Sequence, residues 1–349
     1  MERKMTCTHK KGYLLRRLVT LVVASFVLMS CNITGGGQPN SAPESQAANT
    51  PVHAEGQAAS SPSHDKSEPV VEPAQGQATV EIPHIHGMGF STDGRQLRIA
   101  AHDGLRVFGD GKWSVPDLPA HDYMGYVATD DGFYSSGHPH PTANMVNPFG
   151  LIKSTDGGQT LTRLGFEGES DFHLMGVGYQ SHAIYVLNLG PNSKLSEVGV
   201  YYSLDDGQTW RQSAMQGLTS QPIQIAVHPM EANVLAIATE SGLLLSTDYG
   251  DTLALVGQNE PISSVTFSPD GEVLFLGYQK LSTYDLAGQQ FKSLTMPALA
   301  ADDGLAYLAV NPTKLSEMAL ATFQRNIYLS TDGGQSWSPI AQNGRGNVE

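Results

Sequence analysis

Short apolar runs alternate with turns rich in Gly, Asp and Ser from about residue 80 to the C-terminus. Each long unit opens with an apolar run and continues through three further strand-like segments, without a helical period. The six opening runs start near His84, His121, Asp171, Pro222, Pro261 and Gly304. Their spacing of about 40–50 residues is typical of propeller blades. The pattern therefore predicts an all-β, six-bladed propeller, with 78–82 as a closing outer strand of the sixth blade.

A Ser-x-Asp-x-Gly motif recurs at the turn between the third and fourth strands of four predicted blades. In two copies Trp follows, and in two copies Leu stands in its place. The motif residues are Ser154, Asp156, Gly158; Ser203, Asp205, Gly207, Trp210; Ser246, Asp248, Gly250; and Ser330, Asp332, Gly334, Trp337. Ser and Asp side chains accept hydrogen bonds from turn amides, and Gly adopts backbone angles that other residues avoid. We expect these aspartates to be structural rather than catalytic.

This motif resembles the Asp-box, or BNR repeat, of sialidases and of bacterial propeller lipoproteins named glycosyl hydrolases. The turn pattern is also similar to that of photosystem II assembly factor propellers. The resemblance covers about 80–349 and implies a propeller with Asp-box turns. If the protein is an enzyme, the resemblance implies a glycoside hydrolase. A true sialidase is not expected, because no Arg-Ile-Pro motif is present and most of the domain's arginines lie away from the predicted mouth.

The N-terminus has the pattern of a targeting segment. Six basic residues precede an apolar stretch, Leu18 to Met29, that is short for a bilayer span. Leu28-Met29-Ser30-Cys31 resembles the lipobox of bacterial lipoproteins. We expect 1–30 to be a signal peptide, 31–79 a tether with a lipid on Cys31, and 80–349 the propeller. An uncleaved signal anchor is the alternative. The expected location is extracytoplasmic, on the cell membrane.

Charge and cysteine content narrow the classes of partner. The formal net charge is −14, and removal of 1–30, with six Lys/Arg and one Glu, lowers it to −19. Such acidity argues against nucleic acid as a partner and is compatible with cation binding. Cys31 is the last cysteine of the chain, so the propeller has no internal disulfide. A monomer is expected, because a closed propeller leaves few sheet edges to pair.

Histidines, aspartates and methionines gather at the starts of the inner strands and in the second-to-third strand connections of blades one to three. In a propeller these positions share one rim of the channel. The candidate ligands are His84, His86, Met88, His102, His121, His138, His140, His173 and Met175. On strands, His84, His86 and Met88 would share a face, as would Asp171, His173 and Met175. Imidazole and thioether ligands favour copper or zinc. A polar pocket for a small ligand or glycan, and a purely structural role, remain alternatives.

Three functions are therefore open. A ligand-binding propeller with a metal predicts that nitrogens of His84, His86, His121 and His173 meet within a few ångströms. A glycoside hydrolase predicts two facing carboxylates and an aromatic platform, with candidates Asp103, Asp122, Glu169 and Asp171. A scaffold for another envelope protein predicts an exposed apolar patch and no convergent polar cluster.

Overall fold

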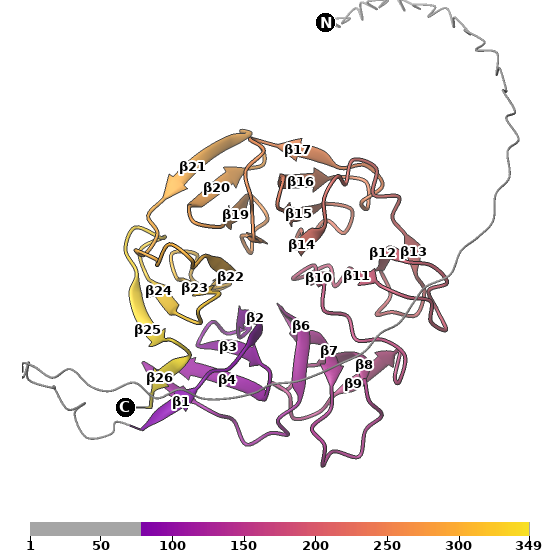
Figure 1. Cartoon of the computed structure of the whole chain (residues 1–349), viewed down its shortest axis with the longest axis horizontal. Helices are drawn as coiled ribbons and strands as arrows, with labels where there is room; N and C mark the ends of the chain where they lie inside the picture. The colour runs from indigo at the N-terminus through magenta and orange to yellow at the C-terminus, as the bar shows by residue number, and fades with distance from the viewer. Residues whose placement is uncertain (1–77, 349) are drawn as a thin grey trace, which may run out of the picture. The chain divides into compact units, whose positions relative to one another are not determined.

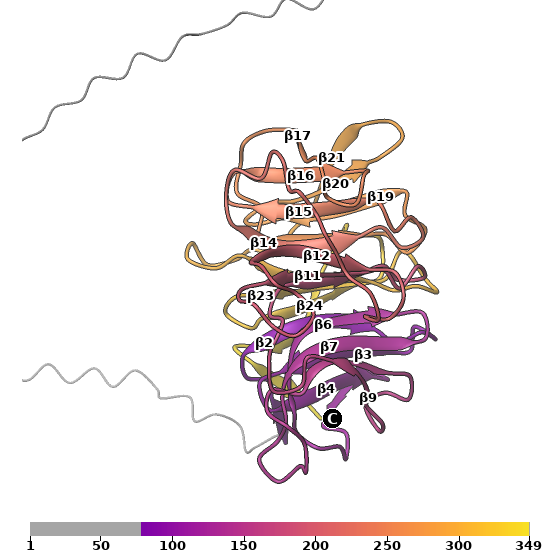
Figure 2. The ribbon, with the colours of Figure 1, turned by 90° about the vertical axis from the view of Figure 1, so that its right-hand side faces the viewer.

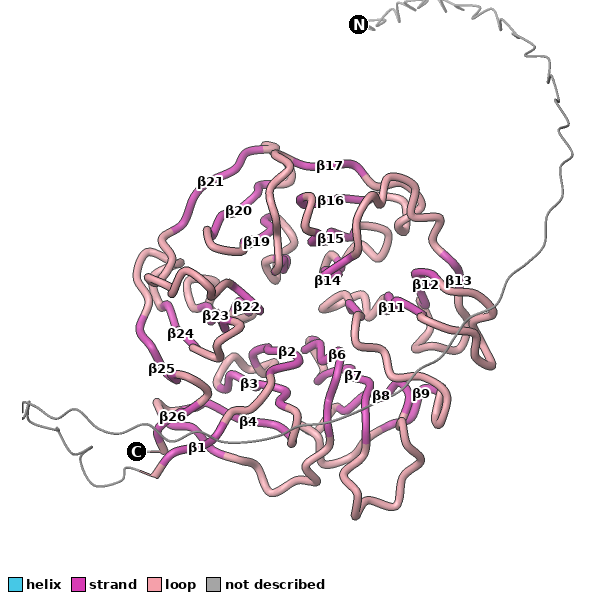
Figure 3. The backbone as a smooth tube through the Cα atoms, viewed as in Figure 1, coloured by secondary structure: helices cyan, strands magenta, loops and turns pink. Residues whose placement is uncertain are grey.

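The computed structural model describes residues 78–348, which fold into six β-sheets arranged around a central channel (Figure 1). Every regular element in this part of the chain is a strand (Figure 3). Viewed from the side, the strands of one sheet, such as β14 to β17, lie one beside the next and form a blade (Figure 2). The predicted six-bladed, all-β propeller is confirmed. Within 78–348 no helix is long and apolar enough to cross a lipid bilayer.

The first three blades carry the histidine-rich segments, and each is a four-stranded antiparallel sheet. Blade one holds β2 (Ile85–Phe90), β3 (Gln96–Ala101), β4 (Gly104–Gly109) and β5 (Lys112–Ser114). Blade two holds β6 (Asp122–Thr129), β7 (Gly132–His138), β8 (Gly150–Ser154) and β9 (Thr162–Gly165). Blade three holds β10 (Met175–Val177), β11 (Ile184–Asn188), β12 (Gly199–Ser203) and β13 (Arg211–Gln212).

The remaining blades complete the ring. Blade four holds β14 (Pro222–Val227), β15 (Leu235–Thr239), β16 (Gly242–Ser246) and β17 (Ala254–Val256). Blade five holds β18 (Ser264–Phe267), β19 (Val273–Gly277), β20 (Leu281–Asp285) and β21 (Gln290–Leu294). Blade six holds β22 (Leu305–Val310), β23 (Met318–Thr322), β24 (Ile327–Ser330), β25 (Ser338–Gln342) and β26 (Arg345–Asn347), to which β1 (Thr79–Glu81) adds.

Strand β1 joins the N-terminal end of the propeller to its last blade. It pairs antiparallel with β26, with Val80 opposite Gly346, and begins one residue before the expected boundary at residue 80. Beside this joint, Trp113 of blade one is 2% exposed and its indole N–H donates to the Ile340 carbonyl at 2.6 Å. The predicted closing strand is confirmed. The expected signal peptide, lipidated Cys31 and almost all of the tether lie outside the described residues.

The recurrent Ser-x-Asp-x-Gly turns share one hydrogen-bond pattern. The Ser203 hydroxyl donates to Asp205 Oδ1 and accepts the Gly207 N–H, each at 2.8 Å. In the other three turns the same bonds are 2.8–2.9 Å long. The hydrogen bonds from Thr209 and neighbouring groups lower the pKa of Asp205 to about 2. Because both carboxylate oxygens of Asp205 accept such bonds, its role is structural.

Apolar side chains fill the space between adjacent blades, so the core is a ring of clusters rather than one centre. A cavity of about 180 Å³ runs along the channel, and its wall includes Met88, Tyr126, Met175 and Phe267. The blades approach closely at Gly125, where φ is +54° and an added Cβ would lie 2.3 Å from the Phe172 carbonyl oxygen. Glycine there lets the segment before β10 lie against β6.

Candidate functional site

The polar groups at the channel mouth come from β2, the turn after β3, the ends of β6 and β7, and the segment before β10. Strand β2 has an irregularity between Ile85 and Gly87, so its faces do not alternate simply through His86. Strand β10 begins only at Met175, so Asp171 and His173 lie in the connection before it. The expectation that Asp171, His173 and Met175 share the face of one strand is therefore wrong. Loop geometry, not strand alternation, directs Asp171 and His173 to the mouth.

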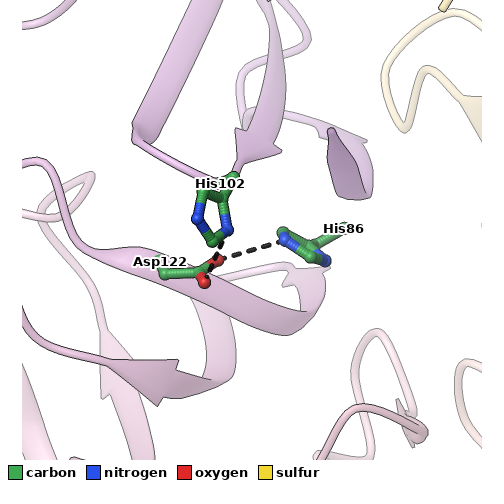
Figure 4. A group of neighbouring side chains, drawn as sticks. All are labelled: His86, His102 and Asp122. Atoms are coloured by element: carbon green, nitrogen blue, oxygen red, sulfur yellow. Dashed lines mark ion pairs between the residues drawn. The ribbon is translucent and has the colours of Figure 1, made fainter. Parts of the chain in front are cut away.

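His86, His102 and Asp122 form the first cluster of the mouth, which we call triad one (Figure 4). His86 Nε2 lies 3.1 Å from Asp122 Oδ1, and His102 Nδ1 lies 2.9 Å from Asp122 Oδ2. The side chains of His86 and Asp122 are 13% and 10% exposed, whereas His102 is 66% exposed. Two imidazoles thus approach one carboxylate, with His102 on the solvent side.

Burial leaves part of triad one without hydrogen bonds. His86 Nε2 and Asp122 Oδ1 are both buried, and their contact lacks the angles of a hydrogen bond despite its length. Burial is the main cause that lowers the pKa of His86 to about 4, and the nearby His84, His102 and His173 lower it further. Burial also raises the pKa of Asp122, against the opposing effect of the nearby histidines. At neutral pH, His86 is therefore a neutral imidazole with a lone pair to offer.

His138, Asp171 and His173 form a second cluster, triad two. The Nε2 atoms of His138 and His173 lie 3.1 and 2.7 Å from the same oxygen, Asp171 Oδ2. Like triad one, this cluster places two imidazoles on one carboxylate. His86 of triad one and His173 of triad two also line the same channel cavity.

The other predicted mouth histidines do not join these triads. The His84 ring lies beside His86, with 4.8 Å between ring centroids. His121 is 3% exposed, and its Nδ1 accepts the backbone N–H of His140 at 2.9 Å. The His140 ring contacts Thr142, with 2.8 Å between Nδ1 and Oγ1. His121 and His140 therefore hold the connection between β7 and β8. The nitrogens that converge with His86 are those of His102, not of His121.

The remaining predicted carboxylates and methionines hold local structure. Asp103 forms a 2.6 Å ion pair with Arg106, and the Glu169 carboxylate accepts the Ser193 hydroxyl at 2.7 Å. Met88 and Met175 pack in the hydrophobic clusters that flank the channel wall, and both triads consist of imidazole and carboxylate groups alone.

Sequence reasoning missed a third cluster, at the turns that end the inner strands. His182 Nε2 lies 2.6 Å from Asp130 Oδ1, and its Nδ1 lies 3.0 Å from the Tyr134 hydroxyl. The Lys153 ammonium lies 2.7 Å from Asp131 and 3.1 Å from His182 Nδ1. The lysine already supplies the positive charge there, so this cluster is a poor metal site. No periodic signal marks these residues, because they come from two turns and two strands that are spread along the sequence from Asp130 to His182.

Two imidazoles and one carboxylate are a recognised ligand set for divalent transition metals. Catalytic zinc is commonly held by two His and one carboxylate with one position open, and a similar facial triad holds Fe(II). With metal–ligand bonds of about 2.0–2.1 Å, neighbouring ligand atoms of a tetrahedral ion lie roughly 3.3 Å apart. The 3.1 Å contact of His86 Nε2 with Asp122 Oδ1 is close to this value.

Comparison with known proteins supports the fold alone. No protein-family model matches the chain, and neither does any curated protein. A GH74 enzyme of Niastella koreensis is similar in structure, with 16% identity, a TM-score of 0.51, and coverage of 76% of this chain and 46% of the enzyme. A GH74 xyloglucanase of Xanthomonas campestris has 18% identity and a TM-score of 0.46 over 76% of this chain and 46% of its own. The protein YCF48, solved bound to D1 peptide, has 17% identity and a TM-score of 0.45 over 75% and 83%. The chain thus spans less than half the length of these two GH74 enzymes.

Proposed function

We propose that the protein is a metal-binding propeller that holds a divalent transition-metal ion at its channel mouth through His86, His102 and Asp122. The observation that carries this proposal is the buried pair His86 Nε2 and Asp122 Oδ1, which lie 3.1 Å apart without a hydrogen bond. Buried polar atoms without partners cost free energy, and a shared cation would satisfy both.

The electrostatics of the triad support a cation rather than an anion. Asp122 supplies negative charge, and His86 is neutral at pH 7 because burial lowers its pKa. At this pH no proton has to leave His86 before it binds a metal ion, so protons do not compete with the ion for this nitrogen. Zinc and copper are the expected ions, since both accept imidazole nitrogen and carboxylate oxygen.

Metal content tests this proposal directly. The full chain, purified with a tag that contains no histidine, is dialysed against zinc or copper and then against buffer, and bound metal is measured by mass spectrometry. Stoichiometric metal should be retained and should decrease in His86→Ala and His102→Ala variants. His140→Ala is the matched control, because His140 lies on the same rim but outside both triads. A chain that retains no metal, or variants that retain it unchanged, would refute the proposal.

We also propose that a lipid on Cys31 anchors the mature protein outside the cytoplasm. The Leu28-Met29-Ser30-Cys31 sequence supports this location. Labelled palmitate should be incorporated into the wild-type chain and not into a Cys31→Ser variant. Label that persists in the variant would contradict the anchor.

A second candidate function, hydrolysis of a glycan, is favoured by one observation: burial raises the pKa of Asp122. A general acid of a glycoside hydrolase needs such a carboxyl group, with a second carboxylate near the scissile bond. Asp171 is the candidate for that role. Release of reducing sugar from a panel of polysaccharides, lost in Asp122→Asn and retained after chelation of metal, would support this function over metal binding alone.

A further inference from the structure

We propose that the channel mouth is a dinuclear metal centre, in which His138, Asp171 and His173 bind a second ion beside the one held by triad one. This inference rests on the proposed function and adds a second metal ion to the same site. Its basis is that the same ligand set, two imidazoles on one aspartate, occurs twice at one mouth.

The contact of His138 with Asn147 favours the tautomer of His138 that can bind a metal ion. Asn147 Oδ1 lies 2.7 Å from His138 Nδ1, so the amide oxygen accepts the Nδ1–H of the ring. In the neutral ring, Nε2 then carries a lone pair that faces Asp171 Oδ2 at 3.1 Å. Two acceptors at this distance repel each other unless a proton or a metal ion lies between them. An outer partner on the far ring nitrogen is typical of histidines that bind metals.

Backbone contacts hold triad two in place. The Phe172 N–H, between Asp171 and His173, donates to the Ser136 hydroxyl of β7 at 2.8 Å. Ser136 in turn donates to the Gly150 carbonyl of β8 at 2.7 Å. His138 itself is the last residue of β7. All three ligands are therefore attached to the rigid sheet of blade two, directly or through one hydrogen bond, as a preorganised site requires.

The two triads are neighbours through direct strand pairing. Asp122 of triad one lies opposite His138 of triad two in the register of β6 and β7. Side chains of directly opposed residues have Cβ atoms about 5 Å apart. His86 and His173 also line the same channel cavity. This register places the two triads side by side at the mouth, as a two-metal centre requires.

The stoichiometry of bound copper tests the second site. The full chain is loaded with Cu(II) by dialysis, and copper per chain is compared between wild type, His173→Ala, His86→Ala and His140→Ala. Two ions are expected in wild type and in His140→Ala, and one in each of the other two variants. His173 lies in an exposed connection, so its replacement leaves the sheets intact. His138→Gln is a second variant for triad two, with the same expected loss of one ion.

Electron paramagnetic resonance gives a second readout of the same samples. Two neighbouring Cu(II) ions couple, so wild type should show a broadened signal that integrates to less than its copper content. The single-triad variants should show one isolated Cu(II) signal that accounts for all their copper. One ion per wild-type chain, lost only in His86→Ala, would overturn the dinuclear centre and leave the proposed function standing. Zero ions would overturn both, and two ions insensitive to His173→Ala and His138→Gln would place the second ion elsewhere.

Discussion

Replacement of Asp122 by Asn separates the role of this residue in metal binding from its role in folding. Both carboxylate oxygens contact imidazoles, at 3.1 and 2.9 Å, so the change removes one charge and one oxygen ligand with little change of shape. Loss of an outer partner of a metal site costs 10- to 100-fold in affinity. For a direct ligand we expect about a 100-fold loss, or about 2.8 kcal/mol at 1.4 kcal/mol per decade.

The thermal shift on adding metal measures this loss. At a free metal concentration of about 100 times the wild-type Kd, binding stabilises the fold by about 2.7 kcal/mol. For a domain of this size that raises Tm by roughly 5–10 °C. At the same concentration the ion at triad one stabilises Asp122→Asn by only about 0.4 kcal/mol, or roughly 1 °C, so this part of the thermal shift is lost while the ion at triad two still contributes.

Without metal, the direction of the Asp122→Asn effect reverses. Burial raises the pKa of Asp122, so the ionised carboxylate opposes folding at neutral pH, and the amide removes that cost. The Tm of the metal-free variant should therefore equal or exceed that of wild type. Calorimetry with and without zinc measures both quantities, with His140→Ala as control. A variant that keeps the full thermal shift, or that melts well below metal-free wild type, would refute the reasoning.

Three further predictions concern the fold. Trp113→Ala should destabilise the joint of blades one and six by roughly 3–5 kcal/mol in urea unfolding, because the indole is buried; a cost below about 1 kcal/mol would contradict its role. His182→Ala should cost about 1–3 kcal/mol through its bonds to Asp130 and Tyr134 and leave the metal content unchanged, and a loss of metal would contradict our exclusion of that cluster. Three turn aspartates have folded-state pKa values lowered to about 2, below their ordinary value of about 4, so their stabilisation is present above about pH 4 and lost as the pH falls towards 2. Acid unfolding followed by circular dichroism should shift to higher pH in Asp205→Asn, and an unchanged acid midpoint would contradict this contribution.

The sequence predicts the fold well because the turns repeat. Ser203 and its counterparts mark the same hairpin in four blades, and hairpins at a fixed spacing permit few architectures. The sequence also predicts a closing strand at 78–82, and the pairing of Val80 with Gly346 of β26 confirms it. Local turn chemistry marks the hairpins, whereas the closing strand pairs residues from opposite ends of the propeller and follows from the need to close the ring.

The candidate site was harder to predict, since it depends on side-chain direction in loops. The rim was identified from the position of the histidines, but His121 could not be distinguished from His102 without knowing that His121 faces the His140 amide. Asp171 and His173 precede β10, where period-two alternation gives no direction. The pairing of Asp122 with both His86 and His102 joins two blades, and such long-range contacts have no local signal.

Anomalous diffraction at the zinc edge from crystals grown with zinc tests the central claim most directly, because it locates the ion. We expect an anomalous peak at about 2.0–2.2 Å from His86 Nε2 and from a carboxylate oxygen of Asp122, with His102 as the third ligand. No peak at the channel mouth, or peaks confined to residues outside the triads, would contradict it.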